Sequence, residues 1–319
     1  MKTSELSSSS PLATRFLAWM KERFPFPNAL LFFILYLTTA ATVRSASIGK
    51  ITLSLSDAVS ALVTWSFFLV LRVFDEHKDY ELDCKNHPQR VLQSGLITLS
   101  HLRIAGGIAI AAQIIWSLLL DKGIGQVSMA WLAMFVWTCL MGKEFFIAEW
   151  LNRNLTWYAV SHMLVMPLIV WWLANLAVPG VALTTELQVM MLLAFISGFC
   201  FEITRKTKGP EEERDTIESY SRIFGTRGSA FVVIALVSTM VLNQLWLTYL
   251  LAGNFPWWAV MILAAFYALS LRQLAMFLRA PSASARGKNE AMVALTMLAG
   301  YAVLISVALA SHGISVTLH

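Results

Sequence analysis

The sequence has very little charge, since only 13% of its 319 residues are Asp, Glu, Lys or Arg, against about a quarter in ordinary soluble domains. Hydrophobic residues make up 57% of the chain, which leaves too little polar surface to cover a globule in water. This balance excludes an ordinary soluble domain and predicts that lipid surrounds most of the chain.

Cysteine is also scarce. Cys84, Cys139 and Cys200 are far apart in the sequence, which excludes a disulfide framework and a zinc site built from paired cysteines. The net charge of +5 is better explained by orientation in a membrane than by nucleic acid, and we expect no nucleic-acid partner. No small-residue cleavage site follows a short apolar region near the start, so we expect no removable signal peptide.

Long apolar windows recur along the chain, and each is long enough to cross roughly 30 Å of hydrocarbon. They predict an all-α, polytopic membrane protein with nine transmembrane helices. We expect residues 1–27 to form a cytoplasmic N-terminal segment and residues 28–319 to form a single nine-helix transmembrane domain. The predicted spans are 28–44, 57–74, 104–120, 126–142, 157–177, 187–203, 228–250, 256–277 and 291–311.

The distribution of charge provides an independent test of nine spans. With this topology, 21 of the 24 Lys and Arg residues fall on one side, and only Arg44, Lys50 and Lys122 fall on the other. An excess of basic residues marks the cytoplasmic side of a membrane protein. We therefore expect a multi-pass integral membrane protein, in the inner membrane if it is bacterial, with its N-terminus in the cytoplasm. The acidic residues share this side, which predicts a function that uses carboxylates there.

The most informative segment is Asp75 to Asp83, directly after the second span. At 100° per residue, Asp75, Asp79 and Asp83 follow one another at helical spacing and share one face. Carboxylates in one stripe repel unless a cation neutralises them, and oxygen ligands of this kind suit Mg²⁺. The alternative is a solvated helix face at the membrane surface, with interspersed bases such as Lys78.

A second polar cluster follows the sixth span. Glu202 lies in an apolar helix end, where a carboxylate without a role is costly. Arg205 and Lys206 follow it and are suited to binding a diphosphate. Lys143 and Glu144 add a third polar point after the fourth span, on the same side of the membrane.

These residues carry a family resemblance. Asp75-Glu76-x-x-Asp79-x-x-x-Asp83, followed by the element Arg90 to Ile97, resembles the first motif region of the UbiA superfamily of intramembrane prenyltransferases. That family has nine helices, with acidic motifs after the second and sixth, so the resemblance covers nearly the whole chain.

The sequence also departs from the family pattern. Asp75 stands where the motif usually begins with Asn, and Cys139 stands where a Tyr-x-x-x-Lys element ending at Lys143 would have its tyrosine. Of the second acidic motif, only Glu202 remains near the helix end. The chain therefore resembles a divergent member, and the sequence leaves open whether a second Mg²⁺ site survives.

The resemblance implies Mg²⁺-dependent transfer of an isoprenyl group from an isoprenyl diphosphate to a small acceptor, expected to be aromatic. It implies metal-binding and catalytic carboxylates, with Lys143 also catalytic, and a basic set that binds the diphosphate. Two alternatives remain: a terpene cyclase on the same scaffold, and a non-catalytic lipid-binding or transport protein. The implied metal ligands are Asp75, Asp79, Asp83 and Glu202; the implied diphosphate ligands are Arg90, Lys143, Arg205 and Lys206.

Overall fold

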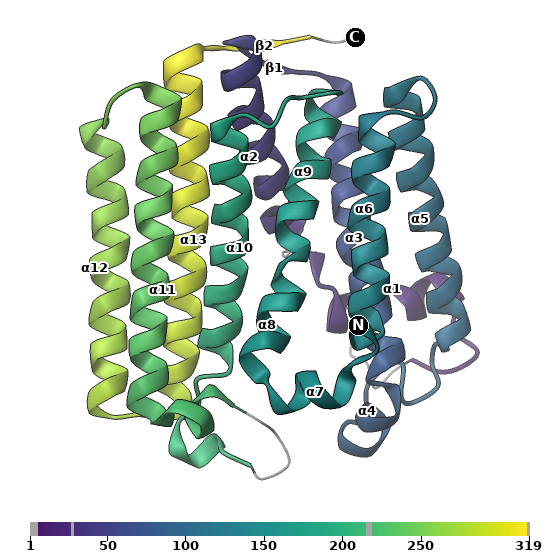
Figure 1. Cartoon of the computed structure of the whole chain (residues 1–319). Helices are drawn as coiled ribbons and strands as arrows, with labels where there is room; N and C mark the ends of the chain where they lie inside the picture. Colours follow the sequence, from purple (N-terminus) through teal and green to yellow (C-terminus); the bar gives the residue numbers. More distant parts are fainter. Residues whose placement is uncertain (1–5, 27–28, 215–218, 318–319) are drawn as a thin grey trace.

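A computed structural model describes residues 6–26, 29–214 and 219–317 of the chain. It is a bundle of long helices that run up and down, joined by short connections at its two ends (Figure 1). The long helices are α2 (Ala29–Ile48), α3 (Leu55–Lys78), α5 (Leu99–Asp121), α6 (Gln126–Gly142), α8 (Leu155–Met163) with α9 (Val165–Ala177), α10 (Thr185–Arg205), α11 (Tyr220–Ala252), α12 (Trp257–Arg279) and α13 (Ala283–His312).

The nine predicted spans are confirmed. Within the described ranges, eight helical segments are long and apolar enough to cross a membrane, and the shorter apolar helix α6 makes the ninth. The fifth span is divided into α8 and α9 at Leu164, near the middle of the span. Pro167 explains the break, because proline has no N–H to donate to the carbonyl one turn earlier. The chain is therefore a multi-pass membrane protein.

The helix ends follow from local chemistry. The side chains of Thr184 and Ser282 accept hydrogen bonds from backbone N–H groups in the first turns of α10 and α13. Gly253, at φ 71°, ends α11 in the left-handed conformation. Helices α11 and α13 begin well before the apolar windows of the sequence. Helix α11 starts at Tyr220 and α13 at Ala283, because both extend beyond their apolar parts.

The remaining elements lie at the ends of the bundle. The segment before α3 and the segment after α13 pair as short parallel strands, β1 (Ile51–Leu53) and β2 (Ile314–Val316). At the opposite end lie the short helices α4 (Tyr80–Asn86), η3 (Glu144–Phe146), α7 (Ala148–Arg153) and η4 (Pro210–Glu212) (Figure 1).

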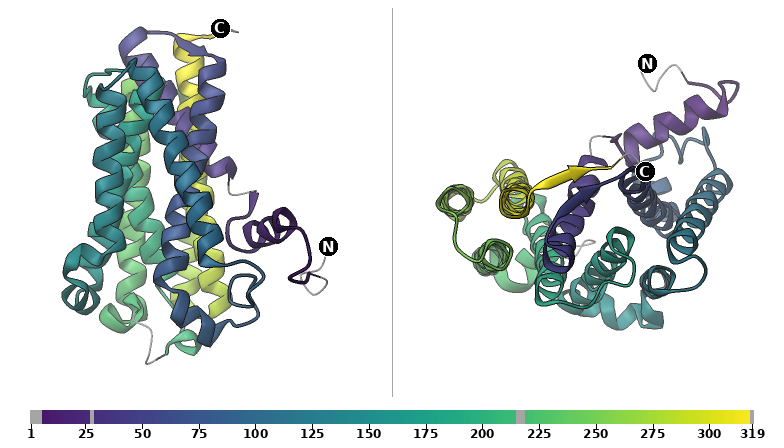
Figure 2. Two further views of the ribbon diagram at one scale, coloured as in Figure 1. Left: turned by 90° about the vertical axis from the view of Figure 1, so that its right-hand side faces the viewer. Right: turned by 90° about the horizontal axis from the view of Figure 1, so that it is seen from above.

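An additional helix, α1 (Leu12–Arg23), lies beside the bundle and not within it (Figure 2). It falls in the predicted N-terminal segment, residues 1–27, which the sequence places before the first span. Trp19 and Met20 of α1 are buried against Val73 and Leu92, so the helix is docked on α3 and on the segment after α4. This docking places Arg23, the last residue of α1, beside the acidic segment that follows α3.

Candidate functional site

The first acidic segment begins in the last turn of α3 and continues into α4. Asp75 lies in α3, Asp79 lies at the junction with φ −94° and ψ 3°, and Asp83 lies in α4. The backbone N–H groups of Asp79 and Asp83 still donate to the carbonyls of Asp75 and Asp79, at 2.9 and 2.8 Å. The three carboxylates therefore lie on successive turns although the helix is interrupted at Asp79.

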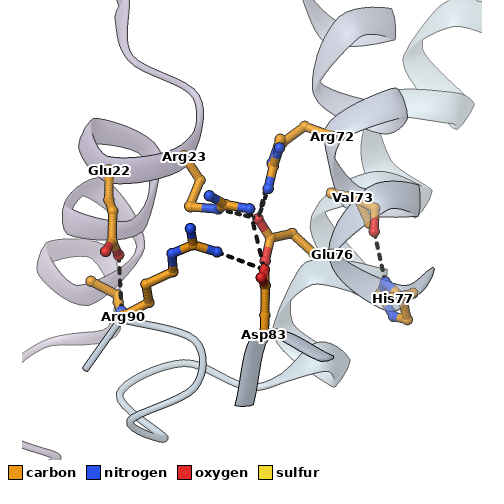
Figure 3. A network of polar contacts seen from close by, with 9 residues as sticks. Glu22, Arg23, Arg72, Val73, Glu76, His77, Asp83 and Arg90 are labelled. Carbon is orange, nitrogen blue, oxygen red and sulfur yellow. Dashed lines mark hydrogen bonds and ion pairs between the residues drawn. The ribbon is translucent and has the colours of Figure 1, made fainter. Parts of the chain in front are cut away.

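Asp83 differs from the other two carboxylates because it is already paired. Its Oδ2 lies 2.7 Å from Arg90 and 3.4 Å from Arg23 of α1 (Figure 3). Asp75 and Asp79 are exposed, and within the described ranges neither forms a side-chain ion pair shorter than 4 Å. Two carboxylates of the predicted stripe thus remain available to a ligand.

A buried carboxylate that the sequence analysis did not single out joins α1 to α3. The side chain of Glu76 is fully buried, and its Oε1 accepts from Arg23 Nε at 2.6 Å and from Arg72 Nε at 2.9 Å (Figure 3). The Arg72 contact has i, i+4 spacing and could have been anticipated. The Arg23 contact spans 53 residues and depends on the docking of α1.

The second polar cluster lies at the end of α10. Glu202 pairs with Arg205 at 2.8 Å and with Lys206 at 2.9 Å, so both bases lie beside a carboxylate of their own helix. Asp75 lies close enough to Arg205 for their charges to interact. The two clusters, which lie far apart in the sequence, are therefore close to each other in space.

Tyr158 of α8 lies between the two clusters. Its hydroxyl accepts a hydrogen bond from Lys78 Nζ at 3.1 Å, and Lys206 Nζ lies over its ring, 5.2 Å from the centroid. Lys78 also pairs with Glu144 at 2.5 Å. Sequence reasoning missed Tyr158, because an isolated tyrosine in an apolar helix carries no local signal. It gave Lys78 no role in the site and named it only in the alternative of a solvated helix face.

A small polar cavity of about 60 Å³ lies beside Tyr158 and Lys78. Its lining includes Asp75, Lys78, Tyr158 and His162. The His162 ring stacks on Tyr158 with centroids 3.9 Å apart, and its Nδ1 lies 2.8 Å from the Tyr158 carbonyl oxygen. His162 therefore fixes the orientation of Tyr158 at the cavity.

A separate apolar cavity of about 180 Å³ lies deeper in the bundle, between α2, α3, α9, α10 and α13. Phe68 and Phe201 line it, one to two turns from Asp75 on α3 and from Arg205 on α10. Phe68 stacks on Phe32 with centroids 3.9 Å apart. Helix α3 and the fifth span, α8 with α9, thus contribute to both the polar cavity and the apolar one.

Among the described residues, Asp75 is the one predicted site residue that lines the polar cavity. Arg90 is paired with Asp83, and Lys143 at the end of α6 lines a larger groove of about 580 Å³ between α3, α5 and α6. Neither residue lines the polar cavity beside Asp75. Local sequence position could not distinguish these placements, because all of these bases lie on the same side of the membrane.

Within the described ranges, no group of three or more His, Cys, Asp or Glu side chains is arranged to hold a metal ion. The available pair, Asp75 and Asp79, still fits Mg²⁺, which typically takes one or two carboxylates and completes its shell with water and substrate phosphates. Partial desolvation raises the pKa of the Asp79 carboxyl; Lys78 opposes this shift, and Asp83 and Glu76 reinforce it. An unneutralised carboxylate of this kind favours a cation beside it.

Comparison with known proteins supports the fold. No protein-family model matches the chain, and no curated protein matches its sequence significantly. Its structure is similar to that of digeranylgeranylglyceryl phosphate synthase, a UbiA-type prenyltransferase, with a TM-score of 0.66 and 16% sequence identity. The similarity covers 93% of this chain and 99% of the other. The chain therefore has the fold of the UbiA superfamily of membrane prenyltransferases.

Proposed function

We propose that this protein transfers an isoprenyl group from an isoprenyl diphosphate to a small acceptor, and that the reaction depends on Mg²⁺. One observation carries the proposal: the carboxylate of Asp75 and the ammonium group of Lys78 line one polar cavity. Lys206 lies over the ring of Tyr158 at this cavity, and an apolar cavity follows along α3. This order of polar and apolar surfaces matches a substrate with a charged head and a hydrocarbon tail.

Asp75 and Asp79 would hold Mg²⁺, and the substrate diphosphate would supply further oxygen ligands. A bound Mg²⁺ would neutralise diphosphate charge and so favour departure of the diphosphate. Lys78 lines the cavity and Lys206 lies over the ring of Tyr158, so both add positive charge there. Arg205 lies at the end of α10, paired with Glu202. Ammonium and guanidinium groups fixed before the reaction stabilise the charge that develops on a leaving group.

Asp83 and Glu202 have a different role in this proposal from the metal ligation that the sequence predicts. Asp83 holds Arg23 and Arg90, and Glu202 holds Arg205 and Lys206. Each carboxylate thereby positions two bases. Direct metal ligation by either residue would require breaking these ion pairs.

The apolar cavity would hold part of the isoprenyl chain. Its wall of aromatic and aliphatic side chains excludes water, which would otherwise capture an allylic cation. A small aromatic acceptor is what the family resemblance in the sequence implies. The product named for the structural neighbour is a glyceryl phosphate, so the shared fold does not restrict the acceptor to aromatics.

The excess of basic residues at the end of the bundle that contains the polar cavity supports a cytoplasmic location for the cavity and for the N-terminus. In a bacterium this would place the protein in the inner membrane. Substrates with long apolar tails would then reach the cavity from the bilayer.

A non-catalytic lipid-binding role is the second candidate, because Glu202 is neutralised by its neighbours and cannot act as a free carboxylate of a second acidic motif. Release of diphosphate distinguishes the two roles. A terpene cyclase would release diphosphate as well, but without any acceptor.

The test uses purified protein supplied with isoprenyl diphosphates, candidate acceptors and Mg²⁺. We expect Asp79→Asn to lower diphosphate release by at least about 100-fold, because it removes a charged ligand at the leaving group. Glu81→Gln is the matched control: Glu81 is an exposed acid two residues away and should be dispensable. Full activity of Asp79→Asn would rule out the metal role of this carboxylate.

A further inference from the structure

A groove of about 580 Å³ lies between α3, α5 and α6 beside the proposed site, and the proposed departure of the diphosphate does not use it. Its three helices lie next to one another (Figure 1). Only 22% of the residues in the apolar window of α5 are buried inside the bundle, so this side of the bundle faces the lipid.

Positive charge gathers at one end of the groove. Lys78, Arg103 and Lys143 line it, and its lining includes no Asp or Glu. Lys78 is paired with Glu144, whereas Arg103 and Lys143 form no ion pair within 4 Å in the described part of the chain. Two bases without carboxylate partners, at the membrane surface, form a site for an anion.

One of these bases is held in place by His77. The Nδ1 of His77 lies 2.8 Å from the Val73 carbonyl oxygen and therefore carries the proton in the neutral ring. Its Nε2 then accepts a hydrogen bond from Arg103 Nε at 3.3 Å. This leaves the terminal nitrogens of Arg103 free to donate to a ligand in the groove.

The rest of the groove is apolar and has room for a chain. Gly106, Gly107 and Gly142 line it, and an added Cβ would contact Val73 at Gly106 and Phe74 at Gly142. A Cβ added to Gly107 would meet nothing within 4 Å, which shows that this position opens onto the cavity. Ile110 continues the apolar wall one turn farther from the charged end.

We propose that this groove binds an amphiphile with a phosphate or carboxylate head, which Arg103 and Lys143 hold, while its apolar part lies along the glycines of α5. Phe74, Lys78 and Gly142 line both the groove and the polar cavity beside Asp75. A head bound in the groove is therefore separated from the proposed diphosphate site by one layer of side chains. This position makes the amphiphile the acceptor of the isoprenyl group, an assignment that rests on the proposed function.

The binding test needs no catalysis. Radiolabelled hexadecyl phosphate is titrated against purified protein in nanodiscs of zwitterionic phosphatidylcholine, without isoprenyl diphosphate. We expect one saturable site per chain, and roughly tenfold weaker binding for each base replaced in Arg103→Gln and Lys143→Gln, because each loses a charge-assisted hydrogen bond. Unlabelled hexadecyl phosphate should displace the probe, and hexadecanol should not.

A second variant tests the apolar part of the groove. Gly107→Leu should weaken binding at least tenfold by filling the space, whereas Gly287→Leu, at an exposed glycine of α13 with equally open surroundings, should not. Arg279→Gln, at an exposed arginine on the same side of the membrane, is the control for charge. Unchanged affinity in Arg103→Gln and Lys143→Gln, or equal displacement by hexadecanol, would overturn the proposal.

Two further measurements separate this proposal from the proposed function. Asp79→Asn should bind the probe like the wild type; loss of binding would place the probe at the diphosphate site and overturn the groove assignment. In the transfer assay, hexadecyl phosphate should raise the apparent KM for the acceptor and leave the KM for isoprenyl diphosphate unchanged. Competition with isoprenyl diphosphate would overturn the acceptor role, whereas absence of transfer would refute only the proposed function.

Discussion

The buried carboxylate of Glu76 provides the sharpest test of how α1 is held on the bundle. Its side chain is fully buried between Arg23 and Arg72. The side chains of these two arginines are 18% and 23% exposed, respectively. In Glu76→Gln the side chain keeps its shape, but two guanidinium groups then face each other without a negative charge between them.

Removing one partner of a buried ion pair costs about 3–5 kcal/mol. Water reaches both arginines in part, and the glutamine oxygen still accepts a hydrogen bond, so we expect the lower figure of about 2–3 kcal/mol. For a chain of this size that corresponds to a fall in Tm of about 3–6 °C. Because Arg23 is the last residue of α1, trypsin should also cleave within α1 faster.

The measurement is the thermal loss of circular dichroism in detergent at a fixed scan rate, with tryptic digestion in parallel. Glu81→Gln, an exposed acid of α4, is the control and should change neither readout. A Glu76→Gln protein with the Tm of the wild type and the same rate of cleavage would refute the claim that this carboxylate holds α1.

Other expectations follow from the same contacts. Asp57→Ala leaves the buried Arg44 without its 2.7 Å partner and should lower the unfolding free energy by about 3–5 kcal/mol, measured as a Tm shift, while an unchanged Tm would contradict it. Tyr158→Phe removes the acceptor of the Lys78 hydrogen bond and should slow transfer several-fold without changing Mg²⁺ affinity, as titration calorimetry with a diphosphate analogue would show. The raised pKa of Asp79 means that a proton competes with Mg²⁺ at higher pH than at an ordinary aspartate; Mg²⁺ affinity should therefore fall as pH is lowered toward that pKa, and this fall should be absent in Asp79→Asn.

Much of the fold could be predicted because the membrane imposes a simple rule on the sequence. Apolar length and the distribution of Lys and Arg determine the number of helices and the end of the bundle where each terminates. The break before Pro167 could also have been anticipated from the missing N–H. Helix α1 was missed because it is too short and too polar to resemble a span, although Trp19 and Met20 follow Phe16 at helical spacing.

The site was less predictable, because its residues meet through tertiary packing. The acidic segment after α3 and the bases after α10 were found by local spacing. Sequence could not show that Asp83 is bound by Arg23, nor that Lys143 lines a different cavity from Asp75. Tyr158 is the clearest case, since its position between Lys78 and Lys206 depends on three helices.

Mass spectrometry of the reaction products tests the central claim most directly. Purified protein is given Mg²⁺, isoprenyl diphosphates of several lengths and a panel of phenolic and anionic amphiphilic acceptors. The account predicts a product with the mass of one acceptor plus one isoprenyl group less one hydrogen, formed together with diphosphate and abolished by EDTA and by Asp79→Asn. Diphosphate release without any acceptor, or no product from any combination, would contradict it.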